Sequence, residues 1–176
     1  KVYVDTFLKP DLYIYKTIFK DALFQINYAQ CKMLKEQKII SDEEAKIIFK
    51  NLNEIENEFD FENLEYNEKY EDLFFLIEKT LIDRIGVDTA GKLHTGRSRN
   101  DMEHTMFRME LRKCIILTIK DLFSLSEHLI KRSEKGTSEI ILLYTHGQPA
   151  QASTLAHFLS AVIEFCLRDI ERLTKA

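Results

Sequence analysis

Apolar residues recur every three to four positions along most of this chain, which is the spacing of one face of an α-helix. Residues 1–9 precede this pattern and are expected to form an extended lead-in, with Pro10 at the start of the first helix. The pattern predicts five helices, at 12–37, after Ser41, at 73–85, at 100–135 and at 150–173.

Turn-forming residues are scarce, and this favours helices over sheets. The 176 residues include five glycines and two prolines, and no glycine precedes Gly86. A β-rich chain needs more turn residues than this. Ser41 and Glu44 have the spacing of a capping box, in which each side chain bonds the other residue's backbone N–H. The sequence therefore predicts an all-α fold.

Composition limits the classes of function. At 45% hydrophobic residues the chain can bury a real core, and its net charge of −4, without a basic tract, argues against general binding of nucleic acid or anionic membranes. No apolar run is long enough to cross a bilayer. The three cysteines are far apart and form no metal-ligand pattern, so we expect reduced, mostly buried thiols in a cytoplasmic protein. We expect no metal ion and no cofactor.

Residues 94–101, HTGRSRND, are all polar or charged except for one glycine, and they lie between two predicted helices. Asn100 or Asp101 is expected to cap the following helix, whose free N–H groups and dipole favour a negative ligand. Arg97 and Arg99 can each grip a carboxylate or phosphate through two hydrogen bonds. The alternative is a solvated, capped connection without a ligand, which such short motifs also fit.

Residues 144–151, YTHGQPAQ, form a second polar segment. His146 is the side chain here that can transfer protons near neutral pH without help. Gly147 and Pro149 shape a turn, so His146 is expected to project from an irregular segment. A lone histidine is more often structural or exposed, and from this segment alone both interpretations stay open.

Taken together, the two segments resemble signatures of the argininosuccinate lyase and δ-crystallin family, within the aspartase/fumarase superfamily. They occur in the family's order, with a similar separation. The resemblance implies an N-terminal helical lyase domain over 1–99, followed over 100–176 by the first long helices of an incomplete central helical bundle. It also implies a homotetramer whose active sites are shared between subunits, acting on a small succinyl-amine.

The resemblance further implies a reaction. Family members break a C–N bond by β-elimination, and argininosuccinate lyase releases arginine and fumarate. His146 matches the acid–base residue, whereas Arg97 is assigned to structural ion pairing first. A reactive serine loop of the family lies beyond residue 176, so these residues alone are expected to be inactive. The positions matched to substrate binding are Asp72, Ser98, Arg99, Asn100, Thr145, Gln148 and Gln151.

Departures from the family pattern bear on substrate identity. Phe74 stands where the family usually has histidine, Met102 where it has glutamine, and Ala152 where it has proline. Two alternatives therefore stay open. One is another fumarate-releasing lyase with a different succinyl-amine, such as adenylosuccinate. The other is a catalytically silent, crystallin-like paralogue.

Overall fold

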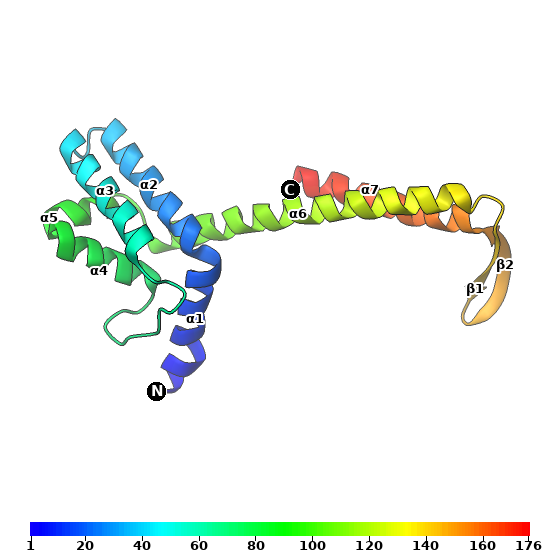
Figure 1. The fold of residues 1–176 in the computed structure, drawn as a ribbon, viewed down its shortest axis with the longest axis horizontal. Coiled ribbons are helices and arrows are strands. Elements are labelled where there is room, and N and C mark those ends of the chain that lie inside the picture. The colour runs from blue at the N-terminus through cyan, green and yellow to red at the C-terminus, as the bar shows by residue number, and fades with distance from the viewer. The chain divides into compact units, whose positions relative to one another are not determined.

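The structure, a computed structural model, describes all 176 residues and divides them into two compact units, Lys1–Glu110 and Leu111–Ala176. Figure 1 shows that helices make up most of both units and that the only sheet is a two-stranded hairpin. The predicted helical fold class is thus confirmed. No helix combines the length and the apolar character that crossing a bilayer requires.

The first unit begins with a nearly continuous helical run. A π-helical turn at Val4–Leu8 leads into α1 (Lys9–Ile14), and a second π-helical turn at Tyr15–Phe19 leads into α2 (Lys20–Glu36). The predicted extended lead-in was wrong. Pro10 lies in the first turn of α1, and the wider turn before it keeps the backbone helical, with Lys9 N–H donating to the Val4 carbonyl.

The next helices begin and end where the sequence indicates. The capping box before α3 (Asp42–Glu58) is confirmed, because Ser41 N–H donates to Glu44 Oε2 at 2.8 Å and Glu44 N–H to Ser41 Oγ at 3.1 Å. Helix α4 covers Leu73–Ile85, as predicted, and ends at Gly86, whose φ of 81° is accessible to glycine. Short helical turns at Val87–Ala90 (α5) and Gly91–His94 follow, and then α6 covers Arg99–Lys135.

The core of the first unit lies between α2, α3, α4 and the start of α6. Met102 and Met106 are buried in it and pack against the other core side chains. Phe61, in the segment 59–72 between α3 and α4, is also buried in this core, so its side chain packs that segment against the helices. The largest side chains that are almost wholly buried are Leu23, Phe24, Leu34, Ile48, Leu52, Ile55, Leu73, Leu81 and Leu93.

The second unit contains the rest of α6, strand β1 (Ile140–Thr145), strand β2 (Gln148–Thr154) and helix α7 (Leu155–Lys175). The strands are antiparallel, and the register shifts after Leu143. The predicted helix start at Ala150 was therefore wrong, because Ala150 lies in β2 at this register shift and residues 151–154 pair with β1. The two turn residues, His146 and Gly147, have φ of 49° and 74°, and a type I′ hairpin turn requires positive φ at both.

The long helices also carry exposed apolar side chains. The expectation of mostly buried cysteines was wrong for Cys114, which is exposed on α6, whereas Cys31 and Cys166 are buried; all three are free thiols. Helices that expose this much apolar surface are typical of interfaces. The exposed apolar residues are Phe107, Leu111, Ile116, Leu117, Phe123, Leu125 and Ile130 on α6, and Phe158, Phe165 and Leu167 on α7.

Candidate active site

The start of α6 is fixed by Ser98 and Asp101. Ser98 Oγ accepts a hydrogen bond from Asn100 N–H at 3.1 Å, and Asp101 Oδ2 accepts one from Ser98 N–H at 3.0 Å. Ser98 therefore caps the helix, and the prediction that Asn100 or Asp101 does so was wrong. The three-residue spacing of Ser98 and Asp101 lets the carboxylate reach back, as in a capping box.

Asp72 and Arg99, which are 27 residues apart in the chain, are bound to each other. Asp72 caps α4, with its side chain 1% exposed and Oδ1 accepting from Phe75 N–H at 3.0 Å. Its Oδ2 accepts from Arg99 Nη2. Burial raises the pKa of the Asp72 carboxyl, while the Phe75 N–H and the Arg99 guanidinium act in the opposite direction.

Arg99 is held by further carboxylates and by aromatic rings. Its guanidinium nitrogens lie 3.7 Å from Glu71 Oε2 and 3.7 Å from Glu103 Oε1. Its guanidinium carbon lies 4.8 Å from the centre of the Phe75 ring, within the range of a cation–π contact. A substrate carboxylate that binds Arg99 has to share the guanidinium with these protein partners.

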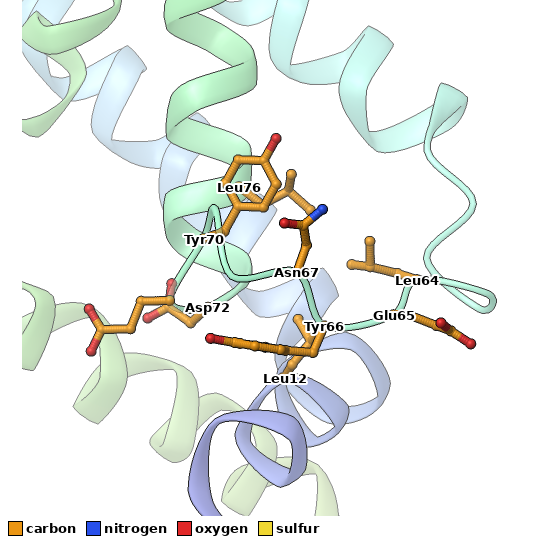
Figure 2. A pocket seen from close by; sticks show the side chains of 9 residues that line it. Leu12, Leu64, Glu65, Tyr66, Asn67, Tyr70, Asp72 and Leu76 are labelled. Atoms are coloured by element: carbon orange, nitrogen blue, oxygen red, sulfur yellow. The ribbon is translucent and has the colours of Figure 1, made fainter. Parts of the chain in front are cut away.

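Asp72 lines two cavities. A cleft of about 530 Å³ includes Asp72, Arg99 and Glu103 in its wall, and there Tyr15 Oη donates to Glu103 Oε1 at 3.0 Å. A second cavity of about 130 Å³ lies under the segment before α4. Figure 2 shows the Tyr66 ring extending from this segment toward Asp72, with Leu12 of α1 beneath it.

Arg97 faces the interior instead of a cleft. Its Nη2 donates to Asn27 Oδ1 at 2.5 Å and lies 3.0 Å from His94 Nδ1. Because a guanidinium can only donate, His94 Nδ1 accepts, and the ring proton sits on Nε2, 3.5 Å from Glu78 Oε1. Burial lowers the pKa of Arg97 to about 10, and burial together with Arg97 lowers the pKa of His94 to about 4. Arg97 is thus a structural cation beside a neutral histidine, although an amide and an imidazole, not a carboxylate, are its hydrogen-bond partners.

The residues of the second motif lie together at the hairpin. Thr145 ends β1, His146 occupies the turn, and Gln148 begins β2. Gln151 lies further along β2, opposite Leu143. All four predicted site residues of this hairpin are exposed, and they belong to the second unit, whereas the site residues near α6 belong to the first.

Sequence reasoning missed the side chains that support this loop and cleft. Asn27 and Gln30 on α2 contact the loop before α6, and Tyr15 and Glu103 bond to each other beside Arg99. A usable signal existed for Asn27, because it is a polar residue at an apolar helical spacing between Leu23 and Cys31. The contacts of the other three residues, Gln30, Tyr15 and Glu103, depend on how the helices pack.

The family described as "Lyase" matches residues 12–176, and the chain therefore belongs to this lyase family. The similar proteins carry a more particular name. The chain is 44% identical to argininosuccinate lyase 2 of Agrobacterium fabrum over 175 residues, covering 99% of this chain and 35% of that protein. It is 40% identical to the argininosuccinate lyase of Methanocaldococcus jannaschii over 162 residues, which cover 92% of this chain and 33% of that protein.

A solved structure supports the same family. The chain superimposes on EDDS lyase in complex with formate with a TM-score of 0.76 and 28% identity, covering 94% of this chain and 33% of that one. The resemblance seen in the two motifs is confirmed by these comparisons. The chain spans about a third of the length of the proteins it matches.

Proposed function

We propose that the whole protein is an argininosuccinate lyase, which cleaves the C–N bond of argininosuccinate to give arginine and fumarate in arginine biosynthesis. Its relatives of that name, at up to 44% identity, support this proposal. The observation in the structure that carries it is His146, an exposed imidazole at the tip of a hairpin with Thr145 and Gln148 on either side of the turn.

The chemistry needs a proton acceptor, a proton donor and stabilisation of negative charge. A proton leaves the carbon next to a substrate carboxylate, so negative charge builds up on that carboxylate. Ser98 and Asn100, at the start of α6, supply donors and the positive end of a helix dipole for this charge. Arg99 adds a cation held by Asp72. His146 takes part in proton transfer, Thr145 orients a carboxylate, and Gln148 and Gln151 add hydrogen bonds.

The same proposal includes the assembly. Residues 1–99 would form the N-terminal helical domain, and residues 100–176 the first long helices of a central bundle. The whole protein would be a cytoplasmic homotetramer whose active sites combine residues of different subunits. The exposed apolar side chains of α6 and α7, such as Phe123 and Phe165, support burial against further helices.

The direct experiment is to incubate the whole protein with argininosuccinate and to follow fumarate by its absorbance. Steady release of fumarate is the expected result. Release from a different succinyl-amine, but not from argininosuccinate, would show that the substrate is wrong while the reaction class is right. Absence of fumarate with every succinyl-amine would favour a silent, crystallin-like paralogue and contradict the proposal.

A further inference from the structure

Helix α2 reaches the loop before α6 at two points. Asn27 is 2% exposed, and its Oδ1 accepts a hydrogen bond from Arg97 Nη2 at 2.5 Å. Gln30, one helical turn later, donates from Nε2 to the Thr95 carbonyl at 2.9 Å. Both contacts join residues more than sixty positions apart in the chain.

The Asn27 contact matters because Arg97 has few other partners. Two of its nitrogens, Nε and Nη1, are buried without a hydrogen-bond partner. The side-chain hydrogen bonds of the guanidinium come from Nη2 alone, to Asn27 and His94, and the Glu78 carboxylate attracts its charge without a hydrogen bond. A buried donor that loses its acceptor carries the cost of desolvation without compensation. Removing the Asn27 oxygen would therefore favour states in which Arg97 leaves its buried position.

The loop has little regular structure of its own to resist that movement. Residues 95–98 lie between a short 3₁₀ turn and α6, and Gly96 there has a φ of 73°. Arg97 is directly followed by Ser98, Arg99 and Asn100. A shift of Arg97 would therefore pull on Ser98, whose side chain and N–H form the cap at the start of α6.

We propose that Asn27 and Gln30 are positioning residues, which hold residues 95–100 in the geometry that binds substrate. This inference rests on the proposed function for its catalytic consequence, but its structural consequence can be measured separately. Their hydrogen bonds go to Arg97 and Thr95 and not to the candidate substrate-binding residues, so both act through the loop. Supporting contacts of this kind keep a binding group within the narrow tolerance that reactions require.

Two pairs of variants of the whole protein test the proposal. Asn27→Leu removes the acceptor and suits the apolar surroundings, whereas Asn27→Asp keeps an oxygen for Arg97. Gln30→Met removes the donor at a less buried position. Asn57→Leu is the matched control, because Asn57 is exposed on α3 and bonds within its own helix, to the Asn53 carbonyl.

Amide hydrogen exchange of residues 95–100 and the kinetics of fumarate release are the two measurements. Asn27→Leu should exchange on the order of tenfold faster in this loop and lose about 10²-fold in kcat/KM, as small misplacements of catalytic groups do. Asn27→Asp should recover most of both quantities. Gln30→Met should show the same changes to a smaller extent, and the control should show neither.

Three results would overturn the proposal. One is wild-type loop exchange in both Asn27→Leu and Gln30→Met. Another is equal damage from Asn27→Asp and Asn27→Leu, because the oxygen acceptor that Asn27→Asp retains would then be shown not to hold Arg97. A third is normal kcat/KM in a variant whose loop exchanges faster than in the wild type.

If the wild-type protein releases no fumarate, the proposed function fails. The exchange rates of residues 95–100 then decide alone whether Asn27 and Gln30 hold this loop. If Asn27→Leu does not fold, Gln30→Met decides.

Discussion

At single residues around the start of α6, burial determines which ionisable groups remain charged. Burial of Asp72 raises the pKa of its carboxyl, and the partly exposed guanidinium of Arg99 that contacts it acts in the opposite direction. His94 has the opposite environment, because burial and the adjacent Arg97 both disfavour its protonated form. His94 is therefore neutral at physiological pH and accepts a hydrogen bond from Arg97.

The shifted pKa of His94 predicts a loss of stability in acid. The pKa is about 4 in the folded protein and about 6.5 when unfolded. Between these values the unfolded chain binds more protons, so the free energy of unfolding falls as pH drops from 6.5 to 4 and is insensitive to His94 above that window. The loss is on the order of 3 kcal/mol, since each pKa unit corresponds to about 1.4 kcal/mol.

The variant His94→Asn isolates this contribution. Asparagine can still offer an oxygen to Arg97 but does not titrate. Urea unfolding at pH 7 and at pH 4.5 should therefore show a smaller acid-induced loss in the variant than in the wild type. Equal losses in the two proteins would mean that His94 is not the group responsible.

At the scale of elements, local signals predict the helices better than the hairpin. Helices α3 and α4 follow from the helical spacing of apolar residues and from side chains at Ser41 and Asp72 that cap them. The hairpin depends on pairing between β1 and β2 and on positive φ at His146, a conformation that is uncommon outside glycine. A short apolar run such as 140–143 fits a strand or a helix equally well, so periodicity alone could not separate them.

The hairpin turn predicts a contrast between two glycine substitutions. Gly147 has a φ of 74°, so Gly147→Ala should destabilise the hairpin by about 1 kcal/mol. Gly91 has a φ of −61° and open space where a methyl group would lie, so Gly91→Ala should be neutral or slightly stabilising. Hydrogen exchange of the β1 and β2 amides should speed up in the first variant and stay unchanged in the second. Equal exchange in both would contradict the assigned turn.

At the scale of the whole molecule, the sequence predicted only part of the site. Ser98, Arg99 and Asn100 are neighbours in the chain, so their proximity follows from the sequence itself. Asp72 was tied to them only through the family resemblance, and its bond to Arg99 depends on how α4 and α6 pack. The spacing of Asn27 marks it as a polar residue in the core, but the partners of Asn27 and Gln30 could not be predicted, because these partners lie on a distant loop.

The exposed apolar surface predicts self-association. Phe165 on α7 is 61% exposed and Phe123 on α6 is 51% exposed, beside other apolar side chains. Light scattering should therefore show concentration-dependent oligomers, and Phe165→Glu should shift them toward smaller species. Glu171→Gln, on the same helix, is the control and should leave the distribution unchanged. A monomer at all concentrations would count against the proposed assembly.

The most direct test of the proposed function compares fumarate release from argininosuccinate by the whole wild-type protein and by His146→Asn. Asparagine tolerates the positive φ of this turn, so the hairpin should persist while the imidazole is removed. Proton transfer by a positioned side chain contributes about 10²–10⁴-fold to a rate, so the variant should be slower by that factor at unchanged helix content. Wild-type rates in His146→Asn would contradict the assignment of His146 and the account built on it.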